Sequence, residues 1–325
     1  MTRVLLGDVG GTYARFALAE PSSIGTIWST EVGAWADVIE ALRAFLASDT
    51  SGKPVDGALI AAAGPVEAGK CRLTNAAWIL DEHKIAGALS LPWVRLVNDL
   101  EAVAAGLADL NPAQCRLVGG TAPLPGAPIA VLSPGTGLGI ACVLIGPAGR
   151  CVMTSEGGHA SLAGMDDQSD KIVGILRRHH GRVSAERVLS GPGLANLHQA
   201  VAEMDGCITP RPTPSDVTTG AFDGSSPYCR SAIDMFCAFL GSVAGDVALT
   251  FGARGGIYIG GGIVPRFVDY FARSSFREHF IAKGRMRPYL ERIPTRVILH
   301  SNPAFVGLMS LASASYERRA VARSR

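Results

Sequence analysis

The hydrophobic and polar positions along this chain follow two alternating patterns. Short apolar runs bounded by glycine, proline or charged residues are typical of buried strands. Longer stretches repeat an apolar residue every three or four positions, which places those side chains on one face of a helix. Because the two patterns follow each other repeatedly, the sequence predicts α/β layers with substantial parallel sheet.

The first part of the chain contains both kinds of element. Val38, Leu42 and Phe45 form one helical stripe, and Asn111-Pro112 ends a later helix. The predicted strands are Arg3–Leu6, Ala14–Ala19, Gly57–Ala63 and Trp93–Val97, and the predicted helices are Asp37–Ala47 and Glu101–Leu110.

A second series of elements follows a passage rich in proline and glycine, Gly119–Pro128, which we interpret as a linker. Its longest helix repeats Ile233, Phe236 and Leu240 at three- and four-residue steps, and another helix opens near Pro265. The predicted strands are Ile129–Leu132, Ile140–Ile145 and Gly256–Ile259, and the predicted helices are Lys171–His180, Ala185–Leu189, Ser231–Leu249 and Pro303–Ser313.

The two series share an internal repeat. Residues Gly7–Leu18 (GDVGGTYARFAL) and Ser133–Leu144 (SPGTGLGIACVL) both read as a strand, a glycine turn with a threonine, and a returning apolar strand. A duplicated domain would place two such hairpins opposite each other across a cleft, at the sheet ends where ligands usually bind.

The glycine turns suit an anion. Glycines allow successive backbone N–H groups to point into one concavity, a threonine hydroxyl adds a donor, and Asp8 could hold magnesium through water. Either turn alone is equally well explained as hairpin chemistry without a ligand. Neither has the Lys of a Walker A loop, and GTGLG does not fit the dinucleotide pattern GxGxxG. The repetition, together with a third run at Gly260–Gly262, favours phosphate binding.

Composition and charge narrow the class of protein. With 325 residues, 48% of them hydrophobic and 18% charged, the chain is long enough for two domains with well-filled cores. A net charge of +2 with dispersed Lys and Arg argues against a nucleic-acid partner. Seven scattered cysteines fit a reducing compartment, and no long uninterrupted apolar window is present. We therefore expect a soluble cytoplasmic protein with no membrane partner.

Asn98 and Asp99 directly follow a predicted buried strand, where side chains reach the ligand-binding edge of a sheet. An aspartate there can accept a proton from an attacking hydroxyl, as the base of a phosphotransferase does. The alternative is that the pair caps the helix that follows, and local sequence alone favours capping.

A second polar group lies in Ser155-Glu156-Gly157-Gly158-His159, where two glycines can fold a carboxylate and an imidazole onto one ligand. Glu186 lies near a predicted helix start, where it could equally interact with the helix dipole or form a salt bridge. Carboxylate, imidazole and amide groups together suit a polyhydroxylated ligand, because each sugar hydroxyl needs a partner. Zinc at His159 is disfavoured, since no ligand spacing surrounds it.

Taken together, these segments resemble the bacterial glucokinase family, ATP-dependent hexokinases of the actin-like ATPase superfamily. The motifs occur in the order and spacing of the family from Leu6 to about Gly307: DVGGT…R, LVNDLEAVA, PGTGLG, SEGGH, VSAERVLSGPGL, IYIGGGIVPR and HSNPAFVG. The resemblance implies a two-domain ribonuclease-H-like fold with a cleft between a smaller and a larger α/β domain. It implies a small domain over residues 1–110, to which a C-terminal helix at about 303–317 returns, and a large domain over 111–302.

The resemblance also implies roles for the polar residues. ATP would phosphorylate the 6-hydroxyl of D-glucose, with Asp99 as the general base and Asp8 near Mg²⁺, and the enzyme would be a homodimer. The residues implied in glucose binding are Asn98, Asp99, Glu156, His159 and Glu186. Those implied in nucleotide binding are Asp8, Gly10, Gly11, Thr12, Gly135, Thr136, Gly137, Gly260, Gly261 and Gly262.

One departure from the family pattern concerns Tyr13, since the family commonly has Asn after Gly-Gly-Thr. The tyrosine either points into the core or changes the entrance to the phosphate site. Ser133-Pro134 also stiffens a stretch that usually holds smaller residues. Two alternative functions stay open: a kinase for another hexose, and a non-catalytic sugar sensor on the same fold.

Overall fold

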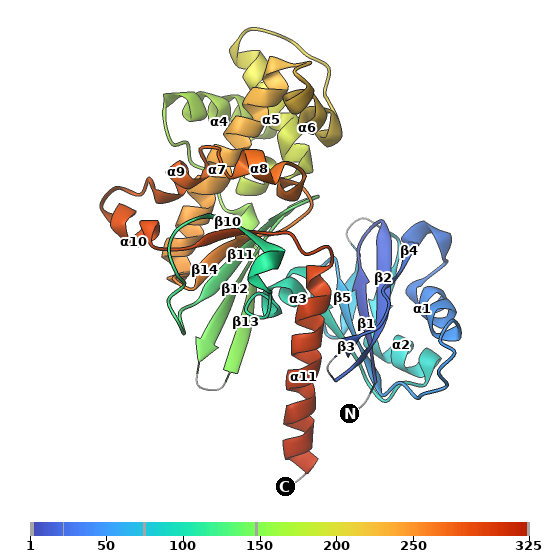
Figure 1. Cartoon of the computed structure of the whole chain (residues 1–325). Coiled ribbons are helices and arrows are strands. Elements are labelled where there is room, and N and C mark those ends of the chain that lie inside the picture. Colours follow the sequence, from blue (N-terminus) through green and yellow to red (C-terminus); the bar gives the residue numbers. More distant parts are fainter. Residues whose placement is uncertain (1–2, 22, 74–75, 147–148, 324–325) are drawn as a thin grey trace. The chain divides into compact units, whose positions relative to one another are not determined.

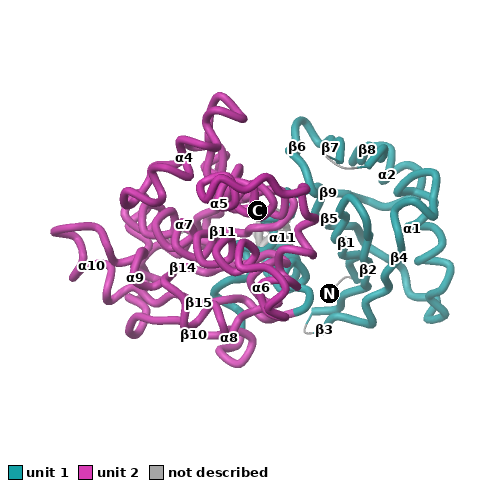
Figure 2. The backbone as a smooth tube through the Cα atoms, turned by 90° about the horizontal axis from the view of Figure 1, so that it is seen from above, with its two compact units in different colours: residues 1–110, 301–325 teal, residues 111–300 magenta. Residues whose placement is uncertain are grey.

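The computed structural model describes residues 3–21, 23–73, 76–146 and 149–323, and side chains as far as residue 313. The chain divides into two compact units (Figure 2). Unit 1 comprises Met1–Leu110 and Ser301–Arg325, and unit 2 comprises Asn111–His300. Each unit contains its own mixed sheet and its own helices (Figure 1).

The sheet of unit 1 is built on a hairpin. Strand β1 (Val4–Val9) pairs antiparallel with β2 (Tyr13–Glu20) and parallel with β5 (Gly57–Ala62), which pairs parallel with β9 (Val94–Asn98). The strand order is β3-β2-β1-β5-β9, and β4 also pairs with β2. The short strands are β3 (Ser23–Ile24) and β4 (Trp28–Glu31), with a separate small sheet of β6 (Val66–Glu67), β7 (Lys70–Arg72) and β8 (Ile79–Asp81).

Helices cover both faces of this sheet, which explains why its central strands are almost uniformly apolar. Alternate strand residues such as Leu5 pack with α1 (Val38–Ala47) and α2 (Glu82–Leu89). The other set, including Leu6, packs with α3 (Asp99–Ala105) and α11 (Pro303–Arg323). The remaining helical segment described in the first 110 residues is the 3₁₀ turn η1 (Val32–Ala34).

The sheet of unit 2 repeats the same plan. Strand β11 pairs antiparallel with β12 and parallel with β14, which pairs parallel with β15, so β12-β11-β14-β15 corresponds to β2-β1-β5-β9 in unit 1. The predicted repeat of a hairpin with a glycine turn is therefore confirmed. The bounds are β10 (Cys115–Gly119), β11 (Ile129–Pro134), β12 (Leu138–Gly146), β13 (Gly149–Ser155), β14 (Gly256–Ile259) and β15 (Thr295–Ile298).

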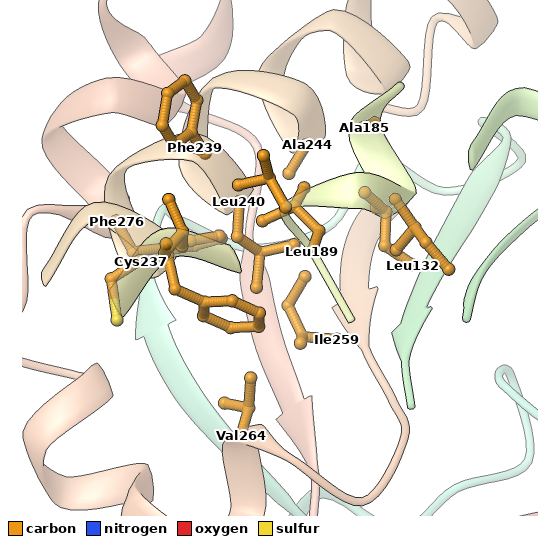
Figure 3. Close-up of a cluster of buried hydrophobic side chains, with 14 of the residues drawn as sticks. Leu132, Ala185, Leu189, Cys237, Phe239, Leu240, Ala244, Ile259, Val264 and Phe276 are labelled. Carbon is orange, nitrogen blue, oxygen red and sulfur yellow. The ribbon is translucent and has the colours of Figure 1, made fainter. Parts of the chain in front are cut away.

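The long helix α7 (Pro227–Phe251) supplies much of the core of unit 2, where Leu240 shares one buried cluster with strand residues such as Leu132 and Ile259 (Figure 3). By length and composition α7 could cross a membrane, but 67% of its most apolar window is buried inside the protein, as expected of a core helix. The other helices are α4 (Asp167–His180), α5 (Gly191–Met204), α6 (Pro214–Asp223), α8 (Val268–Phe271), α9 (Phe276–Ile281) and α10 (Arg287–Glu291). The 3₁₀ turns are η2 (Pro112–Gln114), η3 (Gly157–His159), η4 (Ala185–Arg187), η5 (Val264–Phe267) and η6 (Gly284–Met286).

The structure corrects several predicted elements. Gly119–Pro128 is not the boundary between the units, because unit 2 already begins at Asn111 and β10 joins its sheet. The segment 185–189 forms only the turn η4, since Ser184 caps it and a new helix starts at Gly191. The helix near Pro265 begins as the 3₁₀ turn η5.

Candidate active site

The first glycine turn joins β1 to β2 and is closed by the backbone. The N–H of Gly10 donates to the carbonyl of Tyr13 at 2.9 Å, and the carbonyl of Thr12 accepts from the N–H of Val32 at 2.9 Å. The hairpin register places Arg15 directly opposite Asp8, and their charged groups lie 3.5 Å apart. The turn therefore presents a carboxylate and a guanidinium side by side.

Tyr13 does not enter the core. Its residue is 45% exposed, and its ring centroid lies 6.0 Å from the guanidinium carbon of Arg15. Of the two positions expected for this tyrosine, the structure places it at the entrance of the turn.

Asn98, and not Asp99, caps the helix that follows β9. The side-chain oxygen of Asn98 accepts from the N–H groups of Leu100 at 2.9 Å and Glu101 at 3.3 Å, and its amide donates to the carbonyl of Gly64 at 3.1 Å. Asp99 is the first residue of α3, and one of its oxygens accepts from Leu100 at 2.8 Å. The capping role that could have explained Asp99 thus belongs to its neighbour.

Asp8 lies within the electrostatic influence of Asp99. Burial raises the pKa of Asp8 to about 6; Arg15 lowers it, and the charge of Asp99 raises it. Burial likewise raises the pKa of Asp99, although hydrogen bonds from the N–H of Leu100 oppose the shift. Two carboxyl groups with raised pKa values therefore lie near one glycine turn in unit 1, an arrangement that marks functional sites more often than structural ones.

In unit 2 the polar residues of two separate motifs come together. The Nε2 atom of His159 lies 3.7 Å from a carboxylate oxygen of Glu156, and its Nδ1 atom lies 3.8 Å from one of Glu186. The side chains of Glu156 and His159 are largely exposed, whereas that of Glu186 is 33% exposed. The structure therefore groups these three predicted residues around a solvent-accessible imidazole.

The second glycine turn is held by hydrogen bonds to segments that follow it in the chain. The N–H of Gly191 donates to the carbonyl of Gly135 at 2.7 Å, and the N–H of Leu138 donates to a carboxylate oxygen of Glu186 at 2.9 Å. The third glycine run also lies here: Gly261 has a φ of +76°, and a Cβ on it would lie 2.1 Å from the carbonyl oxygen of Pro134. Only glycine fits at this contact.

Three contacts of the predicted site residues were not predicted from the sequence motifs. Arg15 faces Asp8, the Leu138 N–H binds Glu186, and Arg182 donates to the carbonyl of His159 at 2.6 Å. Only the first had a local signal, because residues facing each other across a short hairpin can be read from its register. The other two pairs depend on packing within unit 2.

Comparison with known proteins decides the family. The sequence profile of the family described as Glucokinase matches residues 5–315. The glucokinase of Nitrobacter hamburgensis is 43% identical over 309 residues, covering 94% of this chain and 96% of that one. The glucokinase of Paramagnetospirillum magneticum is 42% identical over 314 residues, covering 95% and 97%.

The chain belongs to the glucokinase family.

The solved structures agree with this assignment. The crystal structure of glucokinase from an Antarctic psychrotroph has a TM-score of 0.88 at 34% identity and covers 96% of this chain and 98% of its own. At 19% identity, a ROK family glucokinase from Streptomyces griseus, in complex with glucose and AMPPNP, shares the fold with a TM-score of 0.64, covering 95% of this chain and 98% of its own. The predicted family, the ribonuclease-H-like fold class and the enzyme class, an ATP-dependent glucokinase, are confirmed.

Membership of the glucokinase family raises the question of magnesium. Within the described residues, no group of three or more His, Cys, Asp or Glu side chains could enclose a metal ion. Mg²⁺ in kinases keeps several waters and is held by one or two carboxylates together with the phosphates of the substrate. The carboxylate of Asp8, 21% exposed beside the first glycine turn, fits that mode of binding and not a protein-enclosed site.

The electrostatics of Asp8 predict a conflict between function and stability. Because its folded-state pKa is raised to about 6, the folded protein loses stability as the pH rises from about 4 to about 6, and the full penalty is present above that range. We expect Asp8→Asn to stabilise the ligand-free protein by about 1–3 kcal/mol at pH 7.5, and the gain to vanish below about pH 4, where Asp8 is protonated in both states. Urea unfolding at several pH values measures this. A gain that is independent of pH would contradict the explanation.

Proposed function

We propose that this chain transfers the γ-phosphoryl group of ATP to the 6-hydroxyl of D-glucose, with Asp99 as the general base. The observation that carries this proposal is the position of Asp99, a half-buried carboxyl directly after the carboxyl end of β9, whose neighbour Asn98 takes over helix capping. The two compact units serve as the two domains of the kinase. The relatives named above are glucokinases.

Asp99 accepts the proton of the 6-hydroxyl as the oxygen attacks the γ-phosphorus. Burial raises the pKa of Asp99, so its carboxylate is a stronger base than an ordinary aspartate. The hydroxyl oxygen forms a bond to phosphorus while the bond to the β-phosphate oxygen breaks, so ADP leaves. Positioning and charge neutralisation supply most of the rate acceleration in such transfers.

The other predicted residues bind the two substrates. Asn98, whose amide donates to the carbonyl of Gly64, is proposed to bind the sugar together with Glu156, His159 and Glu186, which provide acceptors and a donor for its hydroxyls. The residues proposed to bind nucleotide phosphates through backbone N–H and hydroxyl groups are Gly10, Gly11, Thr12, Gly135, Thr136 and Gly137, with Gly260, Gly261 and Gly262 near the adenosine. Asp8 would hold Mg²⁺ through water, and the ion would supply positive charge to neutralise the phosphates.

A coupled assay with Mg²⁺-ATP across a panel of sugars tests the proposed function. We expect kcat/KM for glucose to exceed that for mannose, fructose and glucosamine. A higher kcat/KM for one of these would establish a different hexose kinase, and binding of glucose without turnover of any sugar would favour the sugar sensor. We further propose a cytoplasmic homodimer, which light scattering and cell fractionation would test.

Tyr13 is expected to affect nucleotide and not sugar. Because its exposed ring lies beside Arg15 at the first turn, Tyr13→Asn should leave the KM for glucose unchanged and alter the KM for Mg²⁺-ATP by about two- to fivefold, the size of an exposed cation–π contact. Tyr13→Phe keeps the ring and serves as the control, with both KM values close to wild type. A large loss of glucose affinity in Tyr13→Asn would show that the ring lies closer to the sugar.

A further inference from the structure

Glu186, which is predicted to bind the sugar together with His159, also contacts the second glycine turn. One of its carboxylate oxygens lies 3.8 Å from Nδ1 of His159, and the other accepts the N–H of Leu138 at 2.9 Å. Leu138 follows Gly137 directly, so this hydrogen bond fixes one end of the second glycine turn. Because both oxygens belong to one planar carboxylate, a shift at one contact moves the other.

The residues around the hydrogen bond between Leu138 and Glu186 are closely packed. A Cβ on Gly137 would lie 2.4 Å from the bonded oxygen of Glu186, and a Cβ on Gly158 would lie 2.0 Å from the carbonyl oxygen of Leu138. Glu186 is itself held in place, because the Ser190 hydroxyl donates to its carbonyl at 2.8 Å. The main chain that carries the carboxylate is therefore fixed, and the carboxylate itself is tied to the turn by its bond to Leu138.

We propose that Glu186 is a positioning residue for the nucleotide as well as a ligand of the sugar. By holding the Leu138 N–H, it sets the conformation of residues 135–137, and glucose bound against its other oxygen fixes it in that position. The two substrates then bind with positive coupling, each raising the affinity for the other by the same factor. This inference rests on the proposed function of the same site.

Glu156 provides a matched control for Glu186. Both carboxylates lie at similar distances from His159, and both are proposed to bind sugar hydroxyls. Of these two side chains, that of Glu186 accepts a hydrogen bond from the glycine turn, whereas that of Glu156 makes none to the turn among the described residues. If Glu186 only bound sugar, replacing either glutamate would change the affinity for nucleotide equally. The proposed positioning role predicts a larger change when Glu186 is replaced.

The decisive experiment measures the binding of Mg²⁺-AMPPNP by calorimetry in the absence of sugar. We expect Glu186→Ala to weaken this binding about tenfold, because a charge-assisted hydrogen bond to the turn is lost. Glu186→Gln retains an oxygen that can accept from Leu138 and should stay within about threefold of wild type, and Glu156→Ala within about twofold. Equal effects of the two alanine variants, or no effect of either, would overturn the inference.

A second experiment changes the glycine turn and measures the affinity for glucose. Gly137→Ala should raise the Kd for glucose, measured without nucleotide, by about tenfold because its methyl group displaces Glu186. Gly135→Ala, whose Cβ would meet nothing within 4 Å, should leave the Kd for glucose unchanged. An unchanged Kd in Gly137→Ala contradicts the link. Failure of the proposed function is distinguishable, because the wild-type protein would then not phosphorylate glucose, whatever the binding constants of the variants.

Discussion

Replacing Asp99 by asparagine is expected to lower kcat for glucose phosphorylation by roughly 10³-fold, within the range that general bases contribute. The amide keeps the size and position of the carboxyl but cannot accept the proton of the 6-hydroxyl. Because Asn98 performs the capping of α3, the helix should still form. The KM for glucose should change less than about threefold if Asp99 acts mainly in the transition state.

Stability measurements separate catalysis from folding in this variant. Burial raises the pKa of Asp99, so the neutral amide removes an unfavourable buried charge, and Asp99→Asn should melt at the same temperature as wild type or higher. Glu101→Gln removes a carboxylate from the same first turn of α3 and serves as the control, with kcat near wild type. A kcat for Asp99→Asn within tenfold of wild type would exclude Asp99 as the general base.

Replacing Gly307 by alanine is expected to lower the free energy of unfolding of unit 1 by more than about 3 kcal/mol, at the upper end of the effects of overpacking. A Cβ at this position of α11 would lie 1.6 Å from the carbonyl oxygen of Ala102 in α3. Gly106 is equally close, since its Cβ would lie 2.6 Å from the N of Gly307. The two helices meet through glycine backbone, so α11 must move away from α3 in the variant.

The effect of Gly307→Ala should reach the active site, because α3 begins with Asp99. We expect a lower melting temperature by calorimetry together with a reduced kcat. The matched control is Gly87→Ala in α2, where nothing lies within 4 Å of the added Cβ and helix propensity predicts a slight gain of about 0.5–1 kcal/mol. Equal melting temperatures for the two variants would show that α11 adapts without strain.

Local sequence patterns were sufficient to predict those helices, strands and turns whose formation depends mainly on their own residues. The glycine hairpins, the buried strands β5 and β14 and the helices α1 and α7 follow from turn chemistry and apolar periodicity, both of which act over a few positions. Helix α5 escaped prediction because its opening Gly-Pro-Gly resembles a loop. In the structure Ser190 caps that helix, and a Cβ on Gly193 would lie 2.4 Å from the carbonyl oxygen of Val188.

By itself, the sequence determined the family, the repeated hairpins and the chemical types of residue that the reaction needs. Only the tertiary structure decided which of these residues contact one another. Whether Asn98 or Asp99 caps α3 depends on the pairing of β9 with β5, and the bond between Glu186 and Leu138 joins residues 48 positions apart. Periodicity and turn signals report energies between near neighbours, whereas such contacts exist only after the strands and turns have packed against one another.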